Sequence, residues 1–345
     1  MKTVWLNKNF AVIREYADAL HRAGYRVLVS HTNADSPQLQ GAAEPHLEPR
    51  GLTGDAYIRW ALEFARSHRV DVFWPGKELR VFARERARFE AAGVTLILPA
   101  GEVILDHLDD KAAFLAGLPD FLRTPPYGVV TTWADMSAAF DIISEQGWTP
   151  CIKPARGVYG HGFRVIVHER RLEDFLAGDT IRMTRDEARG LFAPLASFSP
   201  MLVMGCLTGV ERSIDVVSWQ GQLGAAIIRA KLPGLHGSQL IEQRPDLEEL
   251  VRQAVSHYGL SGVVNVQFKD GPDGAPYILE INARPSGGSH MSALAGPDLP
   301  VWAVRLALGE AQASDVPPPA YGARLLNLHV ARVIHGAPEL AGVLS

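Results

Sequence analysis

The order of strand and helix patterns changes near residue 100, and this change limits the folds open to the chain. In the first hundred residues, short apolar runs typical of strands alternate with helical patterns. Such alternation is typical of a parallel sheet with helices on its faces. From residue 150 onward, strand patterns follow one another through glycine-rich turns, as in antiparallel hairpins. The sequence therefore predicts a mixed fold, in which an α/β unit is followed by α+β units.

The length of the chain predicts more than one packed unit. A single hydrophobic core stops growing at roughly 250–300 residues, and this chain has 345 residues. We expect two or three packed subdomains, with a cleft between them. No Gly-x-Gly-x-x-Gly motif follows the first strand pattern, so the first unit lacks the phosphate-binding turn of a dinucleotide-binding fold.

Charge, hydropathy and cysteine content exclude several classes of protein. The chain has 34 Lys and Arg against 38 Asp and Glu, and this balance argues against a surface built to hold nucleic acid. It has no run of about 18 apolar residues, the length that a membrane span needs, and Asn7, Lys8 and Asn9 interrupt the first apolar residues. Cys151 and Cys206 lie in apolar stretches, as expected of buried, reduced thiols. These features predict a cytoplasmic protein without a nucleic-acid or membrane partner.

A lysine followed by closely spaced glycines forms the first candidate site. Lys153 ends a strand pattern, and Gly157, Gly160 and Gly162 follow it before the next strand begins. Glycine lets backbone N–H groups approach an anion closely because it has no Cβ. The segment is not a Walker A motif, in which the lysine follows the glycines and a helix comes next. The alternative interpretation is an ordinary flexible hairpin.

A hairpin near residue 270 forms the second candidate site. Because side chains alternate along a strand, Glu280, Asn282 and Arg284 share one face, whereas Leu279 and Ile281 point to the other. Gln267 on the partner strand faces the same space if the register places it opposite this row. One or two oxygen ligands together with nucleotide phosphates are how Mg²⁺ is usually held. The alternative is a polar edge that faces solvent.

The two candidate sites, in this order and separated by strand patterns near 203 and 215, resemble the ATP-grasp superfamily. The resemblance is to the branch that contains carbamoyl-phosphate synthetase and biotin carboxylase, and it covers about residues 106–295 and the N-terminal α/β layer. It implies that residues 1–108 form a Rossmann-like pre-ATP-grasp domain. It also implies that 109–202 form the small lid subdomain and 203–345 the subdomain with the metal site, with the nucleotide held between the two.

The resemblance also implies roles for individual residues. It implies that Lys111 and Lys153 contact phosphates, that the segment from Gly157 through Gly160 to Gly162 covers the triphosphate, and that Arg284 steadies the transferred phosphoryl group. The remaining implied contacts are magnesium at Gln267, Glu280 and Asn282, adenine along the hinge strand at Met204, Gly205, Cys206 and Leu207, and the ribose at Glu211.

Two positions depart from the family pattern. Many members place a glutamate in the hinge strand, where this chain has Met204, Gly205 and Cys206. Adenine would therefore be recognised through backbone groups and apolar contacts, so the selectivity for this base stays open. The first metal position is Gln267, where acids are common, although the carbamoyl-phosphate branch also uses glutamine.

Two further segments are candidates for substrate binding. The loop with Ser286, Gly287 and Gly288 could hold a substrate carboxylate or acyl phosphate through its N–H groups and hydroxyls, or could be a turn that leads into the next helix. A second stretch, which could contact the phosphates or the acceptor or could be a solvated surface, contains Arg229, Lys231 and His236. We interpret Lys77 and Arg80, which follow a buried strand pattern, as surface charges.

These features together predict an ADP-forming ATP-grasp ligase. ATP and Mg²⁺, with Mn²⁺ as the alternative metal, would convert a small-molecule carboxylate into an acyl phosphate, and an amine or another nucleophile would displace phosphate. Two other functions stay open: a carbamoyl-phosphate-like step that phosphorylates a carboxylate or bicarbonate, and a nucleotide-binding module without catalysis. The sequence leaves a homodimer open and does not reveal which carboxylate and which acceptor are used.

Overall fold

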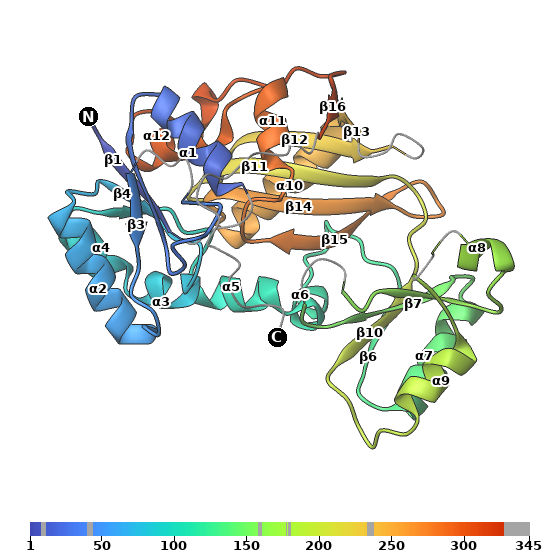
Figure 1. The fold of residues 1–345 in the computed structure, drawn as a ribbon. Helices are drawn as coiled ribbons and strands as arrows, with labels where there is room; N and C mark the ends of the chain where they lie inside the picture. Colours follow the sequence, from blue (N-terminus) through green and yellow to red (C-terminus); the bar gives the residue numbers. More distant parts are fainter. Residues whose placement is uncertain are drawn as a thin grey trace.

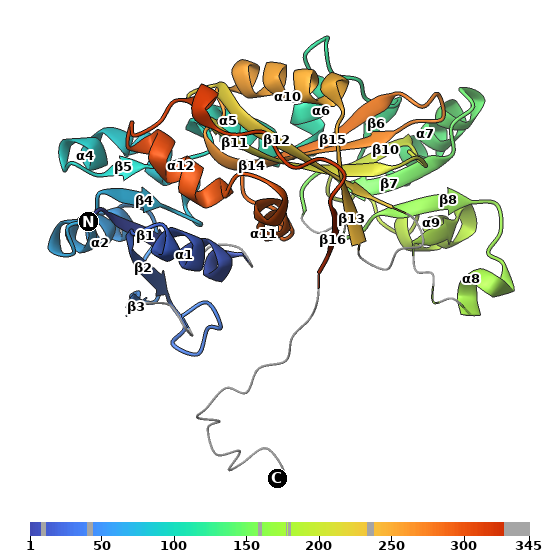
Figure 2. The same cartoon turned by 90° about the horizontal axis from the view of Figure 1, so that it is seen from above.

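A computed structural model describes residues 1–7, 12–39, 44–157, 161–176, 178, 181–232 and 238–327. Strands of this part of the chain form three sheets, which we call the N-terminal, middle and C-terminal sheets. Figures 1 and 2 show the N-terminal and middle sheets at opposite ends of the molecule, with the C-terminal sheet between them. Among the described residues, no helix is both long and apolar enough to span a bilayer.

The N-terminal sheet is parallel, as the alternating patterns predict, and has the strand order β3-β2-β1-β4-β5. Its strands are β1 (Thr3–Asn7), β2 (Arg26–His31), β3 (Glu44–Leu47), β4 (Val72–Trp74) and β5 (Thr95–Leu96). Its helices are α1 (Ile13–Arg22), α2 (Gly54–Ser67), α3 (Leu79–Arg84) and α4 (Arg86–Ala91). Parallel strands buried on both faces read as continuous apolar runs, and the central strand β1 is buried along its whole length.

Two short helices, α5 (Glu102–Asp109) and α6 (Lys111–Ala116), follow the N-terminal sheet. The sequence predicts one helix over about 106–118, whereas the structure breaks it at Asp110. The Asp110 backbone is extended, and its side chain accepts hydrogen bonds from the N–H groups of Ala112 and Ala113. Such a cap starts a new helix, and it places Lys111 at the first position of α6.

The middle sheet has the strand order β6-β10-β7-β8-β9. Its elements are β6 (Tyr127–Val130), α7 (Trp133–Glu145), β7 (Pro150–Pro154), β8 (Arg164–Val167), α8 (Leu172–Leu176), β9 (Arg182–Thr184), α9 (Arg185–Phe192) and β10 (Met201–Gly205). The predicted hairpin around the glycine segment is present as the antiparallel pair β7 and β8. Strand β10 pairs with β6 and β7, so the hinge strand lies in this sheet, although the expected boundary assigns most of it to the third unit.

The C-terminal sheet has the strand order β15-β14-β11-β12-β13-β16. Its strands are β11 (Glu211–Trp219), β12 (Gln222–Lys231), β13 (Ser238–Glu242), β14 (Gly262–Asp270), β15 (Pro276–Asn282) and β16 (Arg324–Leu326). The helical elements of this part are α10 (Pro245–Tyr258), α11 (Ser289–Ser292), η1 (Ala293–Ala295), α12 (Leu299–Ala307) and η2 (Ala313–Asp315). All its pairings are antiparallel, as the predicted hairpins require.

Helices cover both faces of the C-terminal sheet, but not completely. Helix α10 packs with Val264 and Val266 of β14 in one buried cluster, whereas α12 packs with Val263 in another cluster that also contains residues of the N-terminal sheet. Beyond Val263, the same face of β14 carries Asn265 and Gln267, which line a cavity. Because side chains alternate along β14, this strand contributes residues to two apolar cores and to the cavity.

A buried polar network lies beneath the loop that links β15 to α11. Asp215 and Arg229 are 0% and 2% exposed, and the Arg229 Nε donates to Asp215 at 2.8 Å. The same carboxylate accepts hydrogen bonds from Asn265 at 3.0 Å, Ser286 at 2.8 Å and Ser292 at 2.7 Å. Because each oxygen has several donors, this buried charge is well compensated, and the loop is fixed to the sheet.

Arg229 therefore has a structural position, which differs from the expected contact with substrate. Its remaining N–H groups donate to Gln239 and to the hydroxyls of Ser213 and Ser286. A Cβ at Gly288 would lie 2.6 Å from an Arg229 nitrogen, so the glycine lets the loop pass directly over the guanidinium.

We predict that Arg229→Met lowers the free energy of unfolding by about 3–5 kcal/mol, because the substitution leaves the Asp215 carboxylate buried without its cation. Urea denaturation measures the change. Arg252→Met is the matched control, since Arg252 is 52% exposed beside Glu248 and Glu249, and its loss should cost less than about 1 kcal/mol. Equal effects of the two substitutions would show that the Arg229 pair is not a structural anchor.

Candidate active site

A cavity of about 590 Å³, which we call the main cavity, brings together residues of the middle and C-terminal sheets and of α6. Lys153 and Glu280, the central residues of the two sequence motifs, both line it. Its lining consists of Lys111, Cys151, Lys153, Pro154, Gly157, His161, Phe163, Met204, Gly205, Leu207, Glu211, Lys231, Asn265, Gln267, Lys269, Leu279, Glu280, Arg284, Ser286 and Gly287. Thirteen of these twenty residues are candidates that the sequence identifies.

Lys153 enters the cavity from β7 with its ammonium group largely desolvated. Burial lowers the pKa of Lys153, and the charge of Glu280 acts in the opposite direction. The nearby positive charge of Lys111 also lowers this pKa. A desolvated ammonium group interacts strongly with an anion that replaces its lost hydration, so Lys153 is suited to bind a phosphate.

Lys111 joins α6 to both sequence motifs. Its Nζ lies 3.6 Å from Glu280 Oε2 and donates to the Gly157 carbonyl at 2.8 Å. Its backbone N–H donates to the Ala155 carbonyl, and Arg156 pairs with Asp110 at 3.0 Å. The start of the glycine segment is therefore anchored on the N-terminus of α6.

The three glycines of this segment differ in position. Gly157 lines the cavity, whereas Gly162 does not belong to the lining and has a φ of +79°. A Cβ at Gly162 would lie 2.8 Å from the Pro154 ring, so both the backbone angle and the space require glycine there. Gly160 lies outside the described residues.

Strands β14 and β15 place the predicted metal ligands side by side. Gln267 lies directly opposite Glu280, and Asn265 lies opposite Asn282, as the expected register requires. The Asn282 amide donates to Glu280 Oε1 at 2.8 Å, and the Gln267 amide nitrogen donates to Asn265 at 2.9 Å. Because the amide nitrogen of Gln267 makes this hydrogen bond, the amide oxygen is the atom that would bind a metal.

A β-bulge corrects one expectation about this row. The register shifts between Gln267 and Phe268, so that Leu279 is the extra residue on β15. Leu279 lines the main cavity instead of pointing to the opposite face, while Ile281 is buried in the core as expected. A bulge re-aims side chains in this way, and the sequence carried no sign of it.

The row fits Mg²⁺. A carboxylate and neutral amide oxygens are hard ligands of the kind that Mg²⁺ takes together with water and phosphate oxygens. Glu280 supplies the charge, and Gln267 lies across from it. Asn282 supports the Glu280 carboxylate through its hydrogen bond. Its side chain lines a neighbouring cavity, so Asn282 would reach a metal from that cavity.

Apolar and backbone groups form the end of the cavity at the hinge strand. Met204, Gly205 and Leu207 line it, whereas Cys206 does not belong to the lining. A Cβ at Gly205 would lie 2.6 Å from the Trp148 ring, so the indole packs directly on the strand. Hydrogen bonding with Cys206 and burial raise the pKa of the Cys151 thiol, so Cys151 serves as an apolar wall.

Charged residues of β11, β12 and β14 complete the lining of the main cavity. Lys231 pairs with Glu211, and β11 also places Glu211 opposite Lys269. Sequence reasoning missed Lys269 and Asn265, although both follow the alternation with Gln267 along β14. The lining thus holds the cations Lys111, Lys153, Lys231, Lys269 and Arg284 against the acids Glu211 and Glu280.

The residues of the two candidate substrate-binding segments do not all line the main cavity. Ser286 and Gly287 line the main cavity, and space around the Cβ position of Gly287 is open. Arg229 and Gly288 lie behind them in the buried network. His236 falls outside the described residues. Sequence reasoning missed Asp215, although one acid and one arginine, each inside an apolar strand, were the available signal.

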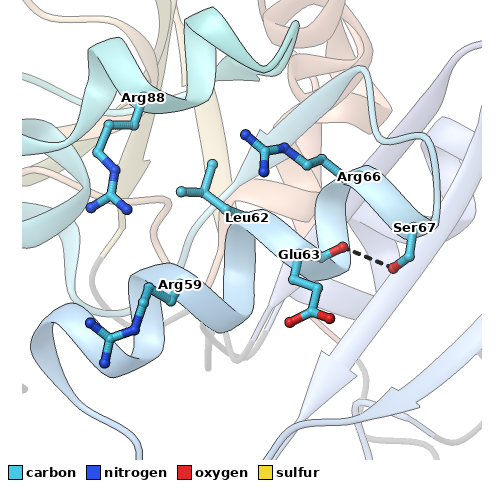
Figure 3. Close-up of a pocket in the computed structure, with 6 residues that line it drawn as sticks. All are labelled: Arg59, Leu62, Glu63, Arg66, Ser67 and Arg88. Atoms are coloured by element: carbon cyan, nitrogen blue, oxygen red, sulfur yellow. Dashed lines mark hydrogen bonds between the residues drawn. The ribbon is translucent and has the colours of Figure 1, made fainter.

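A second cavity of about 530 Å³ adjoins the first and shares Lys111, Gly157, Glu280 and Arg284 with it. Its other wall comes from α3 and α5. A further hollow lies on the outer side of the N-terminal unit, between α2 and α4 (Figure 3). Its six lining residues are Arg59, Leu62, Glu63, Arg66, Ser67 and Arg88, and none of them belongs to the sequence motifs.

Comparison with known proteins agrees with this architecture. A family model described as ATP-grasp in the biosynthetic pathway with Ter operon matches residues 197–331. The carbamoyl phosphate synthase large chain of Streptomyces avermitilis is 26% identical over 197 residues. The match covers 52% of this chain and only 16% of that protein.

Solved structures of two enzymes with bound nucleotides have the same fold. N5-carboxyaminoimidazole synthetase from Staphylococcus aureus, complexed with ADP, has a TM-score of 0.67 at 16% identity, covering 95% of this chain and 82% of that one. Biotin carboxylase from Campylobacter jejuni has a TM-score of 0.64 at 16% identity, covering 92% and 73%. These matches confirm the expected fold class. The ATP-grasp family model thus matches residues 197–331, and the likeness of the whole chain to these solved structures is one of fold.

Proposed function

We propose that this protein is an ATP-dependent ligase that activates a carboxylate as an acyl phosphate and transfers it to a nucleophile, releasing ADP and phosphate. The observation that carries the proposal is the shared cavity, in which Lys153 and Lys111 face Glu280. The excess of cations in its lining suits a triphosphate. The names of the solved relatives, a carboxyaminoimidazole synthetase and a biotin carboxylase, support a reaction at a carboxyl group.

We assign roles to the residues of the main cavity on the basis of their positions. Lys153 and Lys111 bind the phosphates, with Gly157 at the start of the segment that covers them. Met204, Gly205 and Leu207 provide an apolar wall for the base, with Cys206 beside them, and Glu211 lies near the ribose. Glu280 and Gln267, with Asn282 supporting the Glu280 carboxylate, would hold Mg²⁺, or Mn²⁺ as the alternative.

Phosphoryl transfer needs positioned charge more than covalent participation by the protein. A bound Mg²⁺ would neutralise developing charge on the phosphate oxygens. Arg284 lines both cavities. We propose that it binds the transferred phosphoryl group and stabilises the acyl phosphate. Ser286 and Gly287 lie beside it and offer a hydroxyl and a backbone N–H to the carboxylate of the substrate.

Two other functions make different predictions in one assay. A kinase step on a carboxylate or bicarbonate would release ADP without an acceptor, and a binding module would hold ADP without turnover. ADP release is measured with the standard amino acids and small carboxylates as added substrates, and mass spectrometry identifies the reaction products. Release that requires an added carboxylic acid and a nucleophile supports the ligase, whereas nucleotide binding with no release under any condition contradicts it.

We expect Arg284→Ala to slow turnover by at least about 10², because the arginine stabilises charge that develops in the transition state. Affinity for ATP, measured by calorimetry, should stay within a few-fold of the wild type. Arg252→Ala, at an exposed arginine on α10, is the control for loss of a positive charge. Turnover of the Arg284 variant close to that of the wild type would remove this residue from the mechanism.

The lowered pKa of Lys153 predicts that nucleotide affinity falls as the pH rises. Burial shifts this pKa below the ordinary value of lysine, so the free protein loses the charge at a lower pH than an exposed lysine would. Binding of ADP then requires uptake of a proton, and affinity falls by up to about tenfold per pH unit above that pKa. Calorimetry between pH 7 and 10 measures the slope.

Lys153→Arg tests the assignment, because arginine stays charged over this range. The slope should flatten in the variant. A wild-type affinity that does not change with pH would contradict phosphate binding by Lys153.

A further inference from the structure

The two cysteines of the chain lie on neighbouring strands at the edge of the main cavity. Cys151 belongs to β7, and Cys206 directly follows β10. Cys151 lies opposite Met204 in the register of these two strands. The Cys206 N–H continues the pairing by donating to the Thr149 carbonyl at 2.7 Å. Because residues two apart on a strand share a face, both cysteine side chains project from the same face of the middle sheet, as diagonal neighbours.

The two thiols share one apolar environment. Both belong to the same buried cluster as Met204, and a hydrogen bond joins them. Within the described part of the chain, no third histidine, cysteine or acidic residue joins the pair to form a metal site. A structural zinc site needs four such ligands and a catalytic one needs three, so the chemistry open to this pair is that of two thiols.

The two thiols differ in reactivity. The hydrogen bond from Cys151 lowers the pKa of Cys206 against the effect of burial, and the charge of Lys269 also lowers it. The same hydrogen bond and burial raise the pKa of Cys151. Cys206 is 9% exposed and Cys151 3% exposed. Because the thiolate is the reactive form of cysteine, Cys206 is the thiol that reacts first, and Cys151 is the neighbour that can resolve the product.

A covalent bond between these cysteines would change the wall of the main cavity. Cys151 lines this cavity, as do Gly205 and Leu207 on either side of Cys206. Diagonal neighbours on antiparallel strands have Cα atoms roughly 7–8 Å apart, whereas a disulfide holds its Cα atoms about 4.4–6.8 Å apart. The bond would therefore draw the chain at Cys206 toward β7 and move the adjoining wall residues with it.

We propose that Cys151 and Cys206 form an oxidation site, at which a peroxide converts the two thiols into a disulfide that weakens nucleotide binding. The effect on nucleotide binding rests on the proposed function, because it requires the base to lie against Gly205 and Leu207. Formation of the disulfide does not depend on that function.

The reaction balances with hydrogen peroxide as the oxidant. The Cys206 thiolate attacks one peroxide oxygen, the O–O bond breaks, and the hydroxide that leaves takes up the proton released by the thiol, which gives a sulfenic acid. Cys151 Sγ then attacks the Cys206 sulfur, the S–S bond forms, the S–O bond breaks, and the hydroxyl leaves as water with the Cys151 proton. In sum, two thiols are oxidised to one disulfide, and one peroxide is reduced to two water molecules.

Intact-protein mass spectrometry of the full chain tests the site without a nucleotide. After treatment with hydrogen peroxide, the wild type should lose two hydrogen atoms and keep the mass of a single chain. Because the sequence has only these two cysteines, an intrachain disulfide can join no other pair. In Cys151→Ala the reaction should stop at the Cys206 sulfenic acid, which dimedone traps. In Cys206→Ala the remaining thiol should react at least about tenfold more slowly.

Calorimetry with MgADP provides the second readout. The disulfide form should bind MgADP at least about fivefold more weakly than the reduced form, which is the lower end of usual couplings between sites. Dithiothreitol should restore the affinity, whereas methionine sulfoxide needs dedicated reductases for its reversal. The matched control is the double variant Cys151→Ala/Cys206→Ala, whose affinity should not change on treatment with peroxide.

Two results would overturn the proposal. One is a wild-type chain in which peroxide leaves both thiols free or oxidises them separately without an S–S bond. The other is equal MgADP affinity of the reduced and disulfide forms. A reduced chain that does not bind MgADP would instead contradict the proposed function and the effect derived from it, while the mass spectrum still decides whether the disulfide forms.

Discussion

The attraction between Glu280 and lysines from two other elements holds the candidate site together. Lys111 on α6 lies 3.6 Å from the Glu280 carboxylate, and Lys153 on β7 enters the same cavity from the middle sheet. The three elements also meet in one buried apolar cluster, which contains Phe114 of α6, Cys151 of β7 and Ile281 of β15. Because the ammonium group of Lys153 is desolvated, a polyanion in the cavity would replace the hydration that this group has lost. The site is therefore arranged around a charge that the nucleotide would bring.

Two buried networks support this arrangement from either side. Asp215 and Arg229 fix the loop with Ser286 and Gly287 to the C-terminal sheet. Tyr16 of α1 donates to Ser289 at 2.8 Å, so the N-terminal unit holds the same loop. On the other side, Glu48 and Lys77 fix the chain that leads to Glu78. Functional side chains held by such supporting contacts keep their geometry when a ligand binds.

Local patterns predicted much of the fold and of the site. Alternation along β15 put Glu280 and Asn282 on one face, because the side-chain period is local. The register that brings Gln267 opposite Glu280 was left open by the sequence and comes from the structure. The bulge at Leu279 and the positive φ of 55° at Glu78 could not be predicted, because neither position carries a glycine that would mark it in the sequence. The burial of Arg229 is an intermediate case. Its position within an apolar strand was visible, but its partner Asp215 lies on another strand, and only the fold brings the two together.

Crystals of the chain grown with Mg²⁺ and a non-hydrolysable ATP analogue test the central claim most directly. The measured quantities are the distances from the phosphate oxygens to Lys153 Nζ and from the metal to the Glu280 carboxylate. We predict that one triphosphate lies within hydrogen-bond distance of Lys153 while its metal is coordinated by Glu280, at about 2.0–2.1 Å for Mg²⁺. A nucleotide that contacts only one of these two residues, or that binds outside the main cavity, would contradict the account.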